Sequence, residues 1–270
     1  MQLIDQAFKQ KKGIGIIPFI MAGDPKIEVT LDLLQLLDQQ GAMAIELGVP
    51  YSDPLADGIV IQEAAERALK EGITLKQVLE ITIAARQRGV KVPLLLCTYI
   101  NPILQYGVAS LFKEAKKAGI NGLIIPDLPL EESEEFKEIA KEEELALVPL
   151  VAPTSPLKRI QQITASAQGF VYCVSTAGTT GIRGQFSDEV ESFLEQVRKH
   201  SPVPIAIGFG ISDPQHVLRF APYADAAIIG SALVKQIAAR KHRLCLPEER
   251  AKALEEISSW IGKFTSSHQE

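Results

Sequence analysis

Two carboxylates, Glu46 and Asp57, flank a short loop and have the chemistry that proton transfer requires. Glu46 lies within an apolar run (42–47), so we expect its side chain to be partly desolvated and its pKa to be raised toward neutrality. A carboxyl group with such a pKa can both accept and donate a proton during turnover. Asp57 lies beyond the loop, and two carboxylates in different environments can hold different protonation states. An ion pair at a strand end is the structural alternative for Glu46, although the apolar runs contain no strong candidate partner.

Two glycine turns predict a binding site for phosphate. Phe209-Gly210 follows one apolar run, Gly230-Ser231 follows the next, and each leads toward a helix-like stretch. Glycine lets the backbone approach a ligand closely, and a helix N-terminus offers unpaired N–H groups. The structural alternative is that these glycines only form tight turns. An earlier segment rich in glycine and hydroxyl groups (175–187) is expected to be a mobile lid, or else an ordinary connection.

Other common catalytic groups are missing from the places where catalysis would need them. No lysine lies in an apolar run or at its C-terminal end, which argues against a Schiff-base mechanism. The four histidines lie on helix-like stretches or in the tail without metal-ligand spacing, so we expect no metal site. Cys97 and Cys173 lie in apolar runs and are interpreted as core residues. The sequence therefore predicts a phosphate-anchored substrate that is converted by carboxylate acid–base chemistry.

These residues must be positioned by a repeating pattern of apolar runs and helix-like stretches. The runs are rich in Ile, Val, Leu and Ala without polar alternation, which is typical of strands buried on both faces. Eight such units predict an α/β fold, a single (β/α)8 TIM barrel with an extra N-terminal helix and a short extra helix after the eighth strand. An open doubly wound sheet is the alternative, but no G-x-G-x-x-G follows the first run. The expected strands are 14–21, 44–47, 93–98, 122–125, 145–151, 169–174, 203–207 and 226–229.

Composition sets limits on size, partners and compartment. With 270 residues, 46% of them hydrophobic, the chain 1–270 is expected to form one domain. The net charge of −5 and the lack of a long Lys/Arg block argue against binding to nucleic acid or to an anionic membrane. The longest apolar stretch is far shorter than the roughly 20 residues of a membrane span. Three scattered cysteines and the absence of a signal peptide indicate a soluble, cytoplasmic protein.

The chain resembles the α subunits of tryptophan synthase, a family with a specific sequence signature. Residues 46–62 read ELGVPYSDPLADGIVIQ, which is similar to the segment around the family's catalytic glutamate. The resemblance covers about residues 8–235 and includes family-like segments at 18–25, 122–129, 208–212 and 230–232. It implies a TIM-barrel lyase of tryptophan biosynthesis that cleaves indole-3-glycerol phosphate to indole and glyceraldehyde 3-phosphate by a retro-aldol reaction.

Carried over by position, the resemblance assigns a role to each candidate site residue. Glu46 matches the acid–base group that protonates C3 of the indole and handles the proton of the side-chain hydroxyl. Asp57 matches the carboxylate that holds the indole N–H, and Phe19 and Ile61 would flank the indole ring. The remaining substrate contacts are Tyr172 in the pocket, Thr180 in the lid, and the phosphate ligands Gly181, Phe209, Gly210, Gly230 and Ser231.

The resemblance also implies a partner. A β subunit would bind pyridoxal phosphate and condense the indole with serine in an α2β2 heterotetramer, while this chain would carry no cofactor. The family's partner contacts match Asp53, Asn101 and Gln105. Gln105 stands where an asparagine is common in the family, and Asp53 taken alone is also consistent with a simple turn before Pro54.

Three other functions stay open at this point. A free-standing indole-3-glycerol-phosphate lyase would act without a β subunit. Those enzymes lack the LADG sequence and the asparagine-bearing loop, and both are present in this chain, at 55–58 and at Asn101. Another phosphate-binding barrel, such as a sugar-phosphate isomerase, would share the glycine turns. A catalytically silent regulatory subunit would only bind and activate a partner, although both carboxylates are present.

Overall fold

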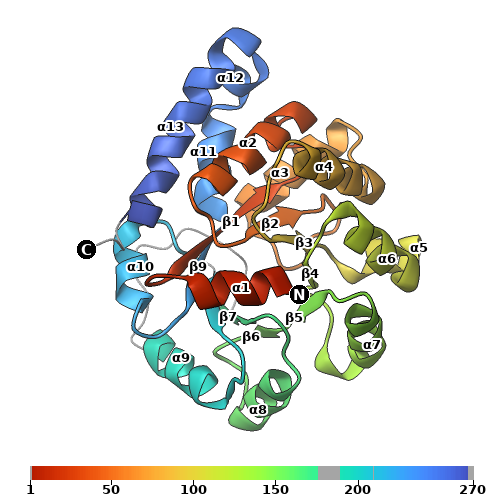
Figure 1. Cartoon of the computed structure of the whole chain (residues 1–270), viewed down its shortest axis with the longest axis vertical. Helices are drawn as coiled ribbons and strands as arrows, with labels where there is room; N and C mark the ends of the chain where they lie inside the picture. Colours follow the sequence, from red (N-terminus) through yellow and green to blue (C-terminus); the bar gives the residue numbers. More distant parts are fainter. Residues whose placement is uncertain (1, 176–188, 209, 267–270) are drawn as a thin grey trace.

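Parallel strands form a ring around an apolar interior, with helices on the outside (Figure 1). The computed structural model describes residues 2–175, 189–208 and 210–266. The strands are β1 (Gly15–Met21), β2 (Ile45–Gly48), β3 (Leu94–Cys97), β4 (Gly122–Ile124), β5 (Ala146–Val148), β6 (Leu150–Val151), β7 (Val171–Val174), β8 (Ile205–Gly208) and β9 (Ala226–Ile229). Neighbouring strands pair in parallel, in the order β5-β4-β3-β2-β1-β9-β8-β7-β6. The predicted barrel architecture is confirmed.

The strand count differs from the prediction because the fifth expected strand (145–151) is interrupted at Pro149. The part before the proline, β5, pairs with β4, and the part after it, β6, pairs with β7. Proline has no N–H group and therefore cannot donate to a strand ladder. Its carbonyl still accepts the backbone N–H of Tyr172 at 2.9 Å. The fifth position of the ring is thus shared by two short strands.

Helices surround the ring, and they include α5 directly after β3 and the short α12. The expected extra helices at the N-terminus and after the last strand are present as α1 and α11. The helices are α1 (Gln2–Gln10), α2 (Ile27–Gln39), α3 (Ile59–Lys70), α4 (Leu75–Gln87), α5 (Ile100–Tyr106), α6 (Val108–Ala118), the 3-10 helix η1 (Leu130–Glu132), α7 (Glu134–Glu142), α8 (Leu157–Ala165), α9 (Glu189–His200), α10 (Pro214–Phe220), α11 (Ser231–Ala239), α12 (Lys241–Cys245) and α13 (Pro247–Ser266).

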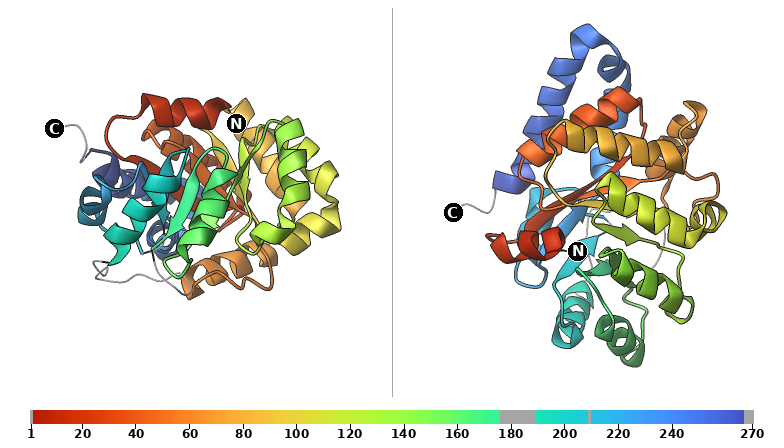
Figure 2. Two further views of the ribbon diagram at one scale, coloured as in Figure 1. Left: turned by 90° about the horizontal axis from the view of Figure 1, so that it is seen from below. Right: turned by 45° about the vertical axis from the view of Figure 1, so that its right-hand side comes forward.

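The first helix covers one end of the barrel (Figure 2). Ile4 and Phe8 of α1 are buried in the same apolar cluster as the strand residues that face the interior. The Phe8 ring lies 5.4 Å from the ring of Phe170, which directly precedes β7. The helix therefore covers the N-terminal ends of the strands, and the C-terminal ends are left for a functional site.

Side-chain alternation along the strands builds two apolar layers. In β3, Leu95 belongs to the cluster inside the ring, whereas Leu94 and Leu96 belong to the cluster between the strands and the helices. Both faces of each strand are therefore buried, which explains the continuous apolar runs.

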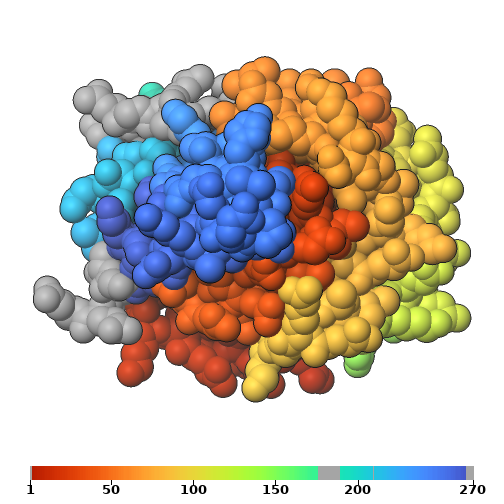
Figure 3. All heavy atoms as spheres, turned by 90° about the horizontal axis from the view of Figure 1, so that it is seen from above, coloured from red at the N-terminus to blue at the C-terminus, as the bar shows by residue number. Residues whose placement is uncertain are grey.

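The C-terminal helices α11 and α13 pack over α3 and α2 (Figure 3). In the described part of the chain, no helix combines the length and the apolar character that crossing a membrane would require.

Candidate active site

One cavity at the C-terminal ends of the strands contains both predicted catalytic carboxylates. Glu46 enters it from β2, and Asp57 enters it from the loop before α3. Six of the nine predicted substrate contacts also line it: Phe19, Ile61, Tyr172, Gly210, Gly230 and Ser231. The other three, Thr180, Gly181 and Phe209, lie outside the described residues, as does nearly all of the predicted lid. The structure therefore brings residues from strands β1, β2 and β7 together with residues that follow β8 and β9.

Glu46 is a buried carboxyl group without a hydrogen-bond partner at one of its oxygens. Its side chain is 2% exposed. Within the described part of the chain, Oε1 of Glu46 has no hydrogen-bond partner and no basic side chain forms an ion pair with the group. Burial raises the pKa of Glu46 to about 8, as we expected from its apolar neighbours. A carboxyl group in this state is protonated at neutral pH and is available to exchange its proton with a ligand in the cavity.

Asp57 has a more polar environment than Glu46. Its backbone carbonyl accepts a hydrogen bond from Nε2 of Gln62 at 2.7 Å. Burial raises the pKa of its carboxyl group, and a hydrogen bond from the hydroxyl of Tyr99 opposes that rise. The two carboxylates therefore differ in the way that separate acid and base roles require, because within the described residues Asp57 has a donor that favours its ionised form and Oε1 of Glu46 has none.

Both glycine turns reach the cavity wall, and one of them places a helix N-terminus there. Gly230 directly precedes α11, and Ser231 is its first residue. The first N–H groups of a helix have no acceptor within the helix, and the helix dipole favours a negative charge there. Gly210 has a φ of +83°, a backbone conformation that favours glycine. These features are suited to holding a phosphate group.

Cys97, which the sequence predicts to be a core residue, packs against both apolar clusters and also reaches the cavity. Its side chain is only partly buried and lines the cavity together with Glu46 and Asp57. Burial, followed by the nearby carboxylates, raises the pKa of the thiol well above its ordinary value. The thiol therefore stays protonated and is a poor nucleophile. Its position could have been found from its spacing of two residues from the inward-facing Leu95.

Sequence reasoning also missed other residues of the cavity wall. Most are apolar residues at strand ends, which resemble core residues in the sequence. They are Ala56, Ile124, Pro126, Leu150, Ile211, Ile228 and Ala232. In the described ranges of the chain, no group of three or more His, Cys, Asp or Glu side chains is arranged to share a metal ion.

The three predicted partner contacts lie on the exposed rim of the same end of the barrel. Asp53 is exposed and accepts a hydrogen bond from the hydroxyl of Ser52 at 2.6 Å. Asn101, at the start of α5, donates to the hydroxyl of Tyr51 at 3.1 Å, and this bond ties the loop 50–58 to α5. Gln105 is exposed on the same helix. The loop and the helix thus form one continuous surface.

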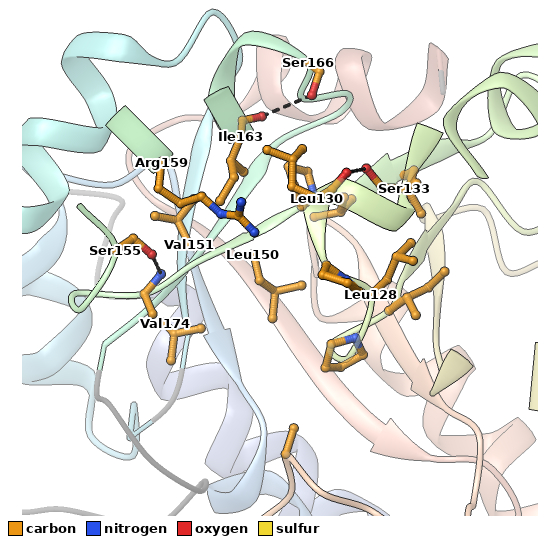
Figure 4. A pocket seen from close by; sticks show the side chains of 18 of the residues that line it. Leu128, Leu130, Ser133, Leu150, Val151, Ser155, Arg159, Ile163, Ser166 and Val174 are labelled. Carbon is orange, nitrogen blue, oxygen red and sulfur yellow. Dashed lines mark hydrogen bonds between the residues drawn. The ribbon is translucent and has the colours of Figure 1, made fainter. Parts of the chain in front are cut away.

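A second hollow lies beside the first, between η1 and α7 on one side and β6 and α8 on the other (Figure 4). The two share Ala56, Pro126 and Leu150 in their walls. The basic groups at this second hollow are paired: Arg159 donates to Glu131 at 2.8 Å, and Nζ of Lys137 lies 3.6 Å from a carboxylate oxygen of Glu134. None of the described residues that line this hollow is an Asp or a Glu, so it adds no carboxylate to the site.

Comparison with known proteins gives a consistent result. A family model described as tryptophan synthase alpha chain matches residues 6–262. The tryptophan synthase alpha chain of Geobacillus sp. (strain WCH70) is 46% identical over 250 residues, which cover 93% of this chain and 95% of the relative. That of Halalkalibacterium halodurans is 44% identical over 267 residues, which cover 99% and 100%. A chain from the tryptophan synthase a2b2 complex of Pyrococcus furiosus has a similar structure, with a TM-score of 0.84, 38% identity and coverage of 94% of this chain and 98% of that chain. The chain belongs to the tryptophan synthase alpha chain family.

Proposed function

We propose that this chain is the α subunit of a tryptophan synthase and cleaves indole-3-glycerol phosphate to indole and glyceraldehyde 3-phosphate. The observation that carries the proposal is Glu46, a carboxyl group that is buried in the cavity wall and has an unpartnered oxygen. A buried polar group without a partner is costly for folding, so its presence at this position supports a role in catalysis.

The reaction needs a proton at C3 of the indole and a base for the hydroxyl on the attached carbon. Protonated Glu46 donates its proton to C3, and Asp57 accepts a hydrogen bond from the ring N–H and stabilises the positive charge that forms. The ionised Glu46 then takes the hydroxyl proton. The bond between C3 and the hydroxyl-bearing carbon breaks, its electron pair returns to the ring, and the carbon becomes the aldehyde of glyceraldehyde 3-phosphate. Each acid–base role of this kind contributes on the order of 10²–10⁴-fold in rate.

The cavity wall suits both ends of this substrate. Phe19, Ile61 and Tyr172 offer apolar surface to the indole ring. Gly210 and the N-terminus of α11 offer backbone N–H groups for the phosphate. An amphipathic substrate with an aromatic ring and a phosphate therefore fits the site better than a sugar phosphate without a ring, which would leave the apolar wall unused.

The proposed partner is a β subunit, in an α2β2 assembly in which the partner holds pyridoxal phosphate and this chain holds no cofactor. The similar P. furiosus chain comes from an a2b2 complex. The rim around the cavity exposes Leu55, Ile59 and Leu104 by 81%, 66% and 54%, and apolar surface of this kind is typical of an interface. Asp53, Asn101 and Gln105 lie on that rim and are the proposed polar contacts.

A cytoplasmic location and a single domain complete the proposal. Cys97, Cys173 and Cys245 are all free thiols, which suits a reducing compartment. The nine strands of the described residues belong to one sheet, which supports the treatment of residues 1–270 as one domain.

The experiment is a direct assay of the purified chain, alone and with a β subunit, for indole release from indole-3-glycerol phosphate. We expect indole in both cases and co-elution of the two proteins in gel filtration. Release of indole without any association with a β subunit would favour the free-standing lyase. A chain that stays inactive with the β subunit present would contradict the proposal and favour a silent regulatory subunit.

A further inference from the structure

Asp57 is held by hydrogen bonds that involve two side chains outside the cavity wall. Nε2 of Gln62, in the first turn of α3, donates to the backbone carbonyl of Asp57 at 2.7 Å. On the other side, the backbone N–H of Ala56 donates to the hydroxyl of Tyr99 at 2.9 Å. The backbone is therefore fixed both at Asp57 and at the residue before it.

Tyr99 is well placed to act as a fixed point. Its side chain is 5% exposed, and its ring lies 5.5 Å from the ring of Tyr51. The next residue, Ile100, donates its backbone N–H to the carboxylate of Asp127 at 2.9 Å, which anchors the start of α5. The hydroxyl of Tyr99 also lies near the Asp57 carboxylate, where it opposes the rise in the pKa of that group. One side chain thus acts on both the backbone and the carboxylate of the loop.

The loop that carries Asp57 needs such support, because much of it is exposed. Asp53 is exposed, and Leu55 is 81% exposed. Exposed loops with few buried contacts open at low free-energy cost. A catalytic group that is misplaced by about 1 Å can lose on the order of 10²-fold in rate. A carboxylate that must face the ring nitrogen therefore depends on contacts from outside the loop.

We infer that Tyr99 and Gln62 are positioning residues that hold Asp57 in place for the reaction, an inference that rests on the proposed function. Neither side chain lines the cavity, so neither is expected to touch the substrate. They act from two separate elements, the start of α5 and the first turn of α3. Loss of either bond leaves Asp57 present but less well oriented.

The test compares Tyr99→Phe and Gln62→Met with matched controls in the full-length chain. Tyr106→Phe removes the hydroxyl that donates to Glu114 on the exposed surface, and Gln35→Met removes a side-chain bond to the carbonyl of Arg88. We expect each positioning variant to lower kcat by about 10- to 100-fold with little change in KM, because orientation rather than binding is lost. The controls are expected to stay within about 2-fold of the unmodified chain.

Two further readouts separate positioning from a general structural effect. In an Asp57→Asn background, Tyr99→Phe and Gln62→Met should cost nothing more, because the group that they orient is already gone. Tyr99→Phe removes a donor that favours the ionised carboxylate, so the acid limb of the kcat profile should move to higher pH. Gln62→Met removes only a backbone contact, so this limb should not move.

The outcomes distinguish this inference from the proposed function. If the unmodified chain releases indole and both variants keep kcat within about 3-fold of it, the inference is overturned and the proposed function stands. If Tyr99→Phe and Gln62→Met lower kcat by the same factor with Asp57 present and in the Asp57→Asn background, the inference is also overturned. If the unmodified chain releases no indole, the proposed function itself fails, and the inference fails with it. Should circular dichroism show that Tyr99→Phe does not fold, Gln62→Met on the half-buried face of α3 decides the question.

Discussion

Phe19 on β1 lies in register with Glu46 on β2, so both side chains project to the same face of the sheet and into the same cavity. The ring of Phe19 extends over Gly48, the next residue of β2 on that face: a Cβ atom at Gly48 would lie 2.5 Å from the ring atom Cζ. The ring therefore occupies space beside Glu46 that water would otherwise fill. Burial raises the pKa of the Glu46 carboxyl group, and Phe19 is one of the apolar residues that line the cavity with it.

The first prediction concerns the pH dependence of activity. Glu46 must be protonated to deliver a proton to C3, and its pKa is about 8, so kcat/KM should fall above about pH 8. The pKa of Asp57 is also raised, so the acid limb should lie above the ordinary value of 3.8. The measurement is kcat/KM from about pH 5 to about pH 10. Phe19→Ala should admit water and move the alkaline limb to lower pH. A rate that still rises at about pH 9 would rule out Glu46 as the acid.

The second prediction concerns stability. Between the ordinary pKa of 4.5 and the folded-state value of about 8, the folded chain keeps a proton on Glu46 that the unfolded chain has lost. The free energy of unfolding should therefore fall with rising pH, by about 1.4 kcal/mol per pH unit from this group, and level off above about pH 8. Glu46→Gln cannot titrate. In urea unfolding, the free energy of unfolding of Glu46→Gln should therefore exceed that of the unmodified chain, by a difference that grows to the order of 4 kcal/mol across this window. A difference in the free energy of unfolding that does not change with pH would contradict the raised pKa of Glu46.

A third prediction uses the contact between β8 and Tyr172. A Cβ atom on Gly208 would lie 2.4 Å from the hydroxyl oxygen of Tyr172, which is buried and has little room to move. Gly208→Ala should cost about 1–3 kcal/mol of stability and lower kcat/KM at least about 10-fold, because Tyr172 is displaced within the cavity.

The matched control for this variant is Gly262→Ala in α13. Its new methyl group would approach only the end of the Gln40 side chain, at 3.2 Å, and alanine is the better helix former. It should gain up to about 1 kcal/mol and keep full activity. Calorimetry and the indole assay check both variants. A Gly208→Ala chain with unchanged melting temperature and activity would contradict this prediction, because it would show that the structure around Tyr172 makes room for the methyl group without cost.

Much of this fold could be predicted from the sequence because both faces of each strand are buried. The run around Leu94, Leu95 and Leu96 is continuous for that reason, and eight such runs suffice to predict a barrel. The break at Pro149 could not be predicted, because the apolar run continues through it and only the pairing of β5 with β4 and of β6 with β7 separates the two strands.

Site residues at the ends of strands could be predicted from the sequence, whereas the contacts that hold the Asp57 loop could not. Strand ends meet at one end of a barrel, so Glu46 and Gly230 were expected to lie together, and the family resemblance placed Tyr172 with them. The bonds from Tyr99 and Gln62 to the Asp57 loop depend on the path of that loop in three dimensions. No periodic pattern in the sequence records such a path.

A fourth prediction concerns the ion pair between Asp24 and Arg67, which joins the β1–α2 connection to α3. Arg67 donates to both carboxylate oxygens of Asp24, at 2.7 and 2.9 Å, and Asp24 is 3% exposed. Arg67→Met would leave a buried carboxylate unpaired and should destabilise the chain by about 3–5 kcal/mol.

The control is Arg88→Met, which breaks the more exposed pair with Asp32 and should cost at most about 1 kcal/mol. Chemical unfolding compares the two variants. Equal losses of stability would show that burial of Asp24 does not set the strength of its pair.

The most direct test of the proposed mechanism is the rate of indole release from saturating indole-3-glycerol phosphate by Glu46→Gln beside the unmodified chain. The amide keeps the size of the side chain but cannot exchange the proton. We predict a rate about 10²–10⁴-fold lower, from a variant that is folded and at least as stable. A variant that retains more than about a tenth of the activity would contradict the role of Glu46 as the acid–base group.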